Sequence, residues 1–132
     1  GWRLLGAIGQ ALEGRPQACL AMNIETVNAP AAAICRLRAG DTTAAVALAD
    51  SLDREAEAGR LGVYPLGFLG AYHAEQGDAE GAIRWLSRAY QLSPTGFDRR
   101  LLATSLFDKV RDDPRFIRGL EAIRSRVRAR FR

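Results

Sequence analysis

Short, regularly placed helix breakers constrain this chain most. Apolar residues recur at spacings of three and four along the sequence, which is typical of amphipathic helices and not of strands. Glycine, proline and short polar clusters interrupt this pattern at 14–16, 28–30, 40–41, 59–62, 77–78, 93–96 and 113–114. The sequence therefore predicts an all-α fold of about eight short helices, with tight connections that make consecutive helices antiparallel neighbours.

Several breaks carry residues that start a helix. Asp41 and Asp78 can accept a hydrogen bond from the free amides of the helix that follows. Pro16, Pro30 and Pro114 suit a first helical turn, because the missing N–H would be unpaired there. We therefore expect helices to begin directly after these positions.

One turn is repeated, since Gly40-Asp41 and Gly77-Asp78 lie 37 residues apart. Around the second copy the chain reads Leu66-x2-Leu69-Gly70-x2-His73, Gly77-Asp78, Ala82-x3-Leu86-x2-Ala89 and Pro94. This pattern resembles the tetratricopeptide repeat, in which small residues such as Gly70, Ala82 and Ala89 lie where paired helices approach closely. The resemblance implies an α-solenoid of helical hairpins.

Two weaker copies extend the resemblance. Trp2-x2-Leu5-Gly6, Ala18-x3-Met22 and Pro30 repeat the offsets of the strong copy, whereas the middle copy keeps its alanines but lacks the aromatic residue and the proline. We expect one domain over 1–132, with hairpins at about 2–27, 29–58 and 63–94 and capping helices at about 97–131. Three extra residues near 59–62 allow a bend before the last hairpin.

The end of the chain is predicted to close the stack. Residues 107–116 resemble the end of tetratricopeptide arrays in bacterial multidomain regulators. Asp113 is a helix N-cap in this interpretation, and the apolar residues that follow share one face: Phe116, Ile117, Leu120, Ile123, Val127 and Phe131.

Composition excludes several classes of protein. Two cysteines are too few for a disulfide scaffold and one histidine is too few for a histidine-based metal site. Cys19 and Cys35 are expected to be small buried hydrophobic residues, with a disulfide between them as the minor alternative in a reducing compartment. No apolar run is long enough to span a membrane, no signal peptide opens the chain, and a cytoplasmic location is expected. A start at Gly1 without methionine suggests a piece of a longer protein.

No motif for catalysis is present. The chain lacks a nucleophile elbow, a phosphate-binding loop and a dinucleotide-binding fingerprint, so we expect neither enzymatic activity nor a cofactor or metal. His73 could form a dyad with a nearby acid, but it occupies a position where the repeat carries a packing residue. Asp50 and Asp53 are expected on a solvated helix face.

The resemblance implies a partner-binding groove along the first helix of each hairpin. Its positions here are Arg3, Ala7, Gln10, Ile34, Leu37, Arg38, Tyr64, Gly67, Ala71 and Glu75. This lining is mostly apolar, which favours an amphipathic helix, an apolar segment or a flanking domain as partner. The expected function is a non-catalytic protein-interaction scaffold, the regulatory module of a larger bacterial protein such as a transcriptional regulator or nucleotide cyclase. An accessory helix could also fill the groove.

The charge distribution supports an alternative. Through Asp98 the chain carries 8 arginines against 11 acids, and after it 10 arginines and one lysine against 4 acids, so the net charge changes from −3 to +7. Five of these arginines alternate along the last helix: Arg124, Arg126, Arg128, Arg130 and Arg132. A helix separates them into two rows that could contact the phosphates of a nucleic acid. A solvated helix end is the simpler interpretation, because aromatic residues for base stacking are scarce there.

Overall fold

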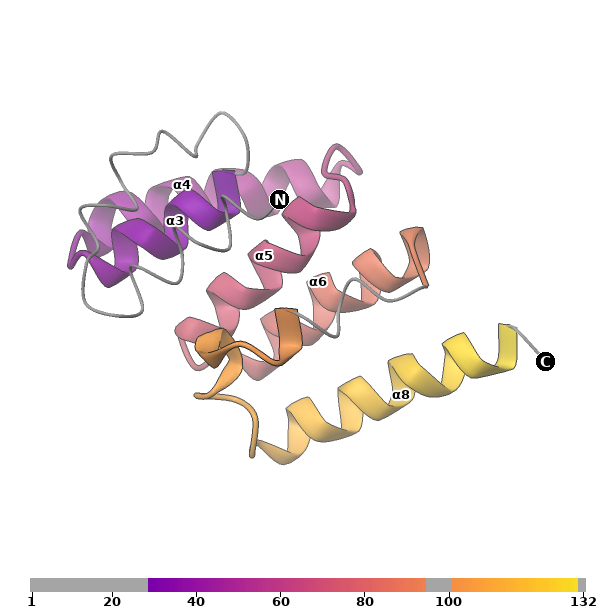
Figure 1. Ribbon diagram of the computed structural model, residues 1–132. Helices are drawn as coiled ribbons and strands as arrows, with labels where there is room; N and C mark the ends of the chain where they lie inside the picture. Colours follow the sequence, from indigo (N-terminus) through magenta and orange to yellow (C-terminus); the bar gives the residue numbers. More distant parts are fainter. Residues whose placement is uncertain (1–28, 95–100, 131–132) are drawn as a thin grey trace. The chain divides into compact units, whose positions relative to one another are not determined.

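The computed structural model of the chain describes residues 29–94 and 101–130 (Figure 1). These residues contain five α-helices and one 3-10 turn, and no strand lies among them, which confirms the all-α prediction for this part of the chain. The chain divides into two compact units, Gly1–Leu61 and Gly62–Arg132. The division falls within the glycine-rich break at 59–62, and the single domain over 1–132 stays a prediction.

The described part of the first unit is a helical hairpin. Helix α3 (Ala29–Arg38) is followed by α4 (Thr42–Glu57), and the two helices pack against each other. Gly40 has a φ of 90°, a left-handed conformation that glycine adopts without a steric penalty. The Asp41 side chain then accepts a hydrogen bond from the Ala44 amide at 3.2 Å, so the predicted N-cap is confirmed.

The second unit contains another hairpin of the same design. Helix α5 (Val63–Glu75) packs along α6 (Ala79–Leu92). Gly77 has a φ of 75°, and Asp78 Oδ1 accepts a hydrogen bond from the Gly81 amide at 2.9 Å. The same glycine-aspartate pair therefore ends one helix and begins the next in both hairpins.

Small side chains allow α5 and α6 to approach closely. A Cβ atom at Gly70 would lie 3.1 Å from the Ala82 carbonyl oxygen and 3.2 Å from Leu86 Cγ. Ala82 and Ala89 are fully buried. The three positions predicted to be small for packing are confirmed as buried, and Trp85, Leu69 and Leu86 fill the core beside them.

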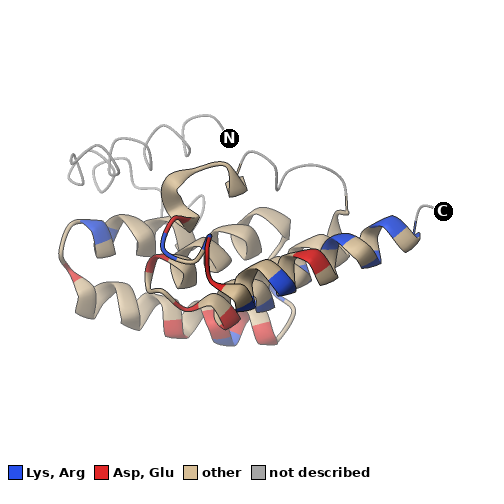
Figure 2. Ribbon diagram, turned by 90° about the horizontal axis from the view of Figure 1, so that it is seen from below, with Lys and Arg blue, Asp and Glu red and all other residues tan. Residues whose placement is uncertain are grey.

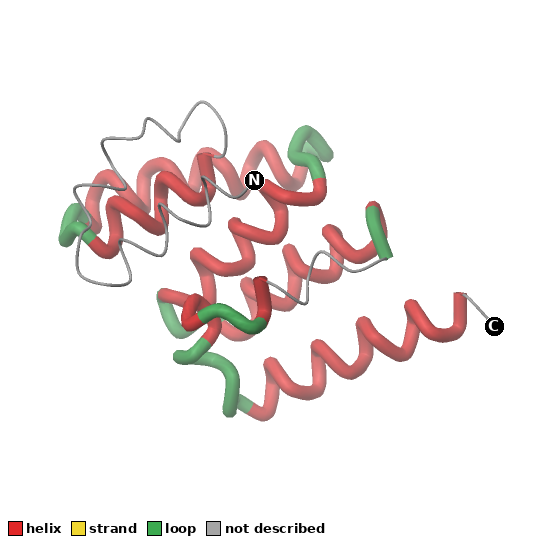
Figure 3. Tube along the Cα trace, in the orientation of Figure 1, coloured by secondary structure: helices red, strands yellow, loops and turns green. Residues whose placement is uncertain are grey.

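Residues 101–113 are the described part of the connection between α6 and the last helix. It includes the 3-10 turn η2 (Ser105–Phe107), which packs against α5, and it ends at α8 (Pro114–Arg130), which packs against α6. Figure 2 shows basic residues recurring along α8, and Figure 3 shows residues 101–113 as short helical pieces joined by loops. The ring centroids of Phe107 and Phe116 lie 5.9 Å apart and join η2 to α8.

Arg111 fixes this connection. Its guanidinium donates hydrogen bonds to the carbonyl oxygens of Leu102 and Thr104, at 3.0 and 2.8 Å, and to Asp108 Oδ1. The Lys109 ammonium donates to the Glu75 carbonyl at the end of α5, at 3.0 Å. The turn is therefore held by backbone acceptors in the residues that precede it and at the end of α5.

The state of one cysteine corrects an expectation. Cys35 is buried, as predicted, but it is disulfide-bonded, whereas a free thiol was favoured. The expectation rested on a reducing compartment, which residue patterns do not establish. The other cysteine of the sequence, Cys19, lies outside the described residues, as does the predicted hairpin at 2–27.

Candidate functional site

The predicted groove residues have very different exposures. Arg3, Ala7 and Gln10 lie outside the described residues. Ile34, Gly67, Ala71 and Glu75 are buried, with Glu75 only 4% exposed. Leu37 is half-buried, Arg38 is exposed and Tyr64 is 60% exposed. A partner can therefore reach Leu37, Arg38 and Tyr64 but not the buried four in this conformation, and the shared groove stays a prediction.

The predicted arginine rows lie on exposed helix surface. Arg124, Arg126, Arg128 and Arg130 are all exposed on α8, and Arg132 lies outside the described residues. At 3.6 residues per turn, members of different rows lie roughly 120–160° apart around the helix. Arg128 donates to Glu121 at 2.8 Å and to Ser125 at 3.3 Å, so its charge is partly neutralised.

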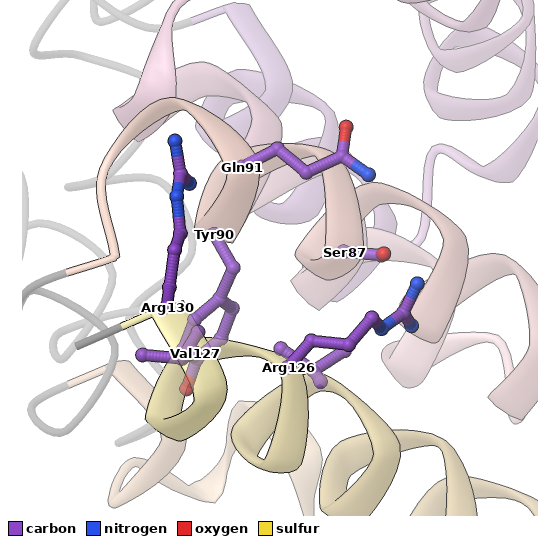
Figure 4. Close-up of a pocket in the computed structure, with 7 residues that line it drawn as sticks. Ser87, Tyr90, Gln91, Arg126, Val127 and Arg130 are labelled. Carbon is purple, nitrogen blue, oxygen red and sulfur yellow. The ribbon is translucent and has the colours of Figure 1, made fainter. Parts of the chain in front are cut away.

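One row lines a small cleft between α6 and α8, which we call the arginine cleft. Its volume is about 60 Å³, and it is lined by Ser87, Tyr90, Gln91, Ile123, Arg126, Val127 and Arg130. Figure 4 shows Arg126 and Arg130 on opposite sides of Tyr90 and Val127, with Gln91 and Ser87 along the α6 side. The buried residues Tyr90 and Ile123 form its apolar floor.

A larger cleft lies on another side of α8, and we call it the Ile117 cleft. Its volume is about 360 Å³, and it is lined by Leu102, Arg111, Phe116, Ile117, Leu120, Glu121 and Arg124. Ile117 is 52% exposed at this cleft. Its surroundings combine an apolar centre with two basic residues and one acidic residue.

The exposure of Ile117 corrects the expectation that it shares the packing face of the last helix. Phe116, Ile123 and Val127 fall within about 20° of one line along the helix, whereas Ile117 is rotated by about 100° from Phe116. Phe116 and Ile123 are buried and Val127 is half-buried, so this line is the side that packs. Phe116, Ile123 and Val127 therefore form the packing side of α8, and Ile117 lies outside that side.

Neither cleft was identified from the sequence. Both depend on which helix α8 packs against, and residues 79–92 and 114–130 give no direct signal for that pairing. One usable signal was Gly119, because a Cβ atom there would lie 2.7 Å from Ile83 Cγ1 on α6. A glycine inside an arginine-rich helix marks a close approach of another element.

The histidine considered for a catalytic dyad is paired with an aspartate at the turn between α5 and α6. His73 Nδ1 lies 3.1 Å from Asp78 Oδ2, but the other oxygen of this carboxylate caps α6. The pair therefore stabilises the turn, and no group of three potential metal ligands gathers in residues 29–94 or 101–130. None of the helices in these ranges is long and apolar enough to cross a membrane.

An ion pair between Arg115 and Asp113 lies at the start of α8. The Arg115 guanidinium donates to Asp113 Oδ2 at 3.0 Å, and the Arg115 amide donates to Oδ1 at 2.9 Å. These hydrogen bonds lower the pKa of Asp113 below its ordinary value and raise the pKa of Arg115. Asp113 thus caps the helix as a carboxylate, as predicted.

Comparison of the chain with protein-family models, with curated proteins and with solved structures finds no match.

Proposed function

We propose that this chain is a non-catalytic helical scaffold that binds another polypeptide, and that α8 supplies a docking surface at the Ile117 cleft. The observation that carries the proposal is the exposure of Ile117 beside Leu120 and Leu102, over a cleft of about 360 Å³. An exposed aliphatic side chain at an apolar cleft with a charged rim is typical of an interaction site.

The rigidity of α8 supports this assignment. Its packing side is buried at Phe116 and Ile123, its first turn is capped by Asp113, and Arg111 fixes the chain that precedes it. A docking residue on an anchored helix loses little conformational freedom when a partner binds. The same argument supports the tetratricopeptide-like hairpin of α5 and α6 as the scaffold that holds α8 in place.

The cleft favours an amphipathic helix as the bound segment. Ile117 and Leu120 are separated by one helical turn, so apolar residues spaced by three or four on a partner helix can pack against them. The rim carries Arg124 and Glu121, which can pair with polar residues that flank this apolar stripe. In a longer protein such a module regulates the domains attached to it.

A displayed library of short helical peptides tests the proposal. We expect enriched peptides to share an apolar stripe at helical spacing, and Ile117→Asp to weaken their binding at least about tenfold by placing a charge on the apolar centre. Ala122→Asp is the matched control, because Ala122 is exposed on α8 about 140° away from Ile117.

Both variants should keep the far-UV circular dichroism of the parent, since both positions are exposed. Absence of any enriched peptide, or an equal loss of binding in the two variants, would exclude the Ile117 cleft as the docking surface.

A further inference from the structure

We propose that the arginine cleft is a binding site for a phosphoryl group, either free phosphate or a phosphate carried by a small molecule. The site is formed by Arg126 and Arg130 of α8 together with Ser87 and Gln91 of α6. It lies on another side of α8 than the Ile117 cleft, and it does not depend on the proposed function.

Hydrogen-bond donors come from both helices that line the cleft. Figure 4 shows the two arginines on either side and the side chains of Gln91 and Ser87 along α6. Guanidinium, hydroxyl and amide groups all donate to anionic oxygens, and arginine is the preferred partner of phosphate in proteins. Donors on several sides suit a tetrahedral anion better than a planar carboxylate, which one arginine can satisfy in a bidentate contact.

The two arginines are available for a ligand. Arg126 Nε donates to the Ala122 carbonyl at 3.4 Å, near the upper limit for a hydrogen bond, so little is lost when it turns to an anion. Arg130 makes no ion pair with any residue that the structure describes. Arg128, in contrast, is held by Glu121.

The parts of α6 and α8 beside the cleft are basic, and Glu80 and Glu121 border them. Residues 81–92 of α6 and 122–130 of α8 contain six arginines and no acidic residue: Arg84, Arg88, Arg124, Arg126, Arg128 and Arg130. The buried side chains of Tyr90 and Ile123 close the floor and exclude water from one side of the ligand. A charge-assisted hydrogen bond at such a partly dry surface is stronger than one in open solvent.

The size of the cleft favours a phosphoryl group over a larger ligand. A water molecule needs about 10–15 Å³ of this kind of space, so 60 Å³ holds about four to six water-sized groups. A phosphate has four oxygens, whereas a nucleoside or a peptide helix would have to remain outside.

The same geometry disfavours a nucleic-acid duplex. A duplex that lies against one side of α8 and contacts Arg126 and Arg130 does not reach Arg124 and Arg128, because the rows lie roughly 120–160° apart on the helix. Half of the described arginines of α8's last turns would therefore make no phosphate contact, and the salt dependence of binding would be correspondingly weak.

Titration calorimetry of the full chain with inorganic phosphate tests the proposal. We expect a dissociation constant on the order of 1 mM in low salt, which corresponds to a few charge-assisted hydrogen bonds at a solvent-exposed site. The double variant Arg126→Gln/Arg130→Gln should weaken phosphate binding at least about tenfold. The matched control is Arg124→Gln/Arg128→Gln, which removes the same charge at the same spacing from the other row and should change the constant less than about twofold.

Two further measurements separate the alternatives. Ser87→Ala keeps both arginines and should weaken phosphate about threefold or more by removing one donor on α6. Acetate should bind more weakly than phosphate, and Ile117→Asp should leave phosphate binding unchanged. Equal losses in the two arginine pairs would overturn the proposal in favour of a diffuse charge effect. A short duplex that binds more tightly than phosphate and responds to both pairs would overturn it in favour of nucleic acid.

Discussion

Gly70 tests the packing on which the second hairpin depends. Replacing glycine by alanine inside a helix normally stabilises it by about 0.5–1 kcal/mol, because the unfolded chain loses conformational freedom. At Gly70 the new methyl group would lie 3.1 Å from the Ala82 carbonyl oxygen and 3.2 Å from Leu86 Cγ. Overpacking of a buried contact costs about 1–3 kcal/mol. We therefore expect Gly70→Ala to lower the free energy of unfolding by about 1 kcal/mol, the difference between the two effects.

A double-mutant cycle identifies whether Ala82 or Leu86 causes the steric clash with a methyl group at position 70. The Ala82 oxygen belongs to the backbone of α6 and cannot withdraw without moving the helix, whereas the Leu86 side chain can be shortened. Leu86→Ala alone should cost about 2–5 kcal/mol, because Leu86 is fully buried. If the clash is with the Leu86 side chain, Gly70→Ala will be neutral or stabilising in the Leu86→Ala background.

Urea unfolding followed by far-UV circular dichroism measures these differences, with an unchanged dependence on urea as the check that the unfolded state is the same. The reasoning is refuted if Gly70→Ala by itself raises stability by the full propensity gain of about 1 kcal/mol. That result would mean that α5 and α6 have room between them at this position.

Three other changes test local contacts. Asp78→Ala should destabilise the chain by about 1 kcal/mol in urea, and Asp78→Asn by less, because asparagine can still cap the Gly81 amide. Arg111→Met should lower the melting temperature by removing hydrogen bonds to two carbonyl oxygens, a loss of about 1 kcal/mol for this half-exposed group. Because the pKa of Asp113 is lowered in the folded state by Arg115, this carboxylate stabilises the fold above its unfolded pKa, and the contribution disappears as pH falls through the lowered value. Asp113→Asn should therefore lower the free energy of unfolding at neutral pH, and this free energy should fall less between neutral and acidic pH than it does in the parent chain.

Local chemistry explains why the caps and turns could be predicted. An N-cap requires only a side-chain oxygen and the backbone amide three residues later, so Asp41 and Asp78 predict the start of their helices from sequence alone. The packing role of Gly70 and Ala82 could be predicted for a similar reason, since small residues at this spacing allow two paired helices to approach closely.

Long-range packing explains what could not be predicted. Ile117 has the same hydropathy as Ile123, and only the position of α6 decides that one is exposed while the other is buried. The burial of Ile34 and Ala71 likewise depends on what covers α3 and α5, which periodicity within each helix does not contain. The disulfide of Cys35 depends on the redox environment, which residue patterns do not establish.

The period-two spacing of the arginines is what gives α8 two chemically different sides. Because a helix advances about 100° per residue, alternate arginines fall into two rows, and Glu121 lies close to the row of Arg128. That row is partly neutralised and borders the apolar Ile117 cleft, whereas the row of Arg126 and Arg130 keeps its charge and faces the donors of α6. A single acidic residue thus separates a surface suited to a polypeptide from one suited to an anion. Glu121→Gln should reduce this distinction: in that background Arg124→Gln/Arg128→Gln should weaken phosphate binding, whereas in the parent chain the same pair of changes leaves it nearly unaltered.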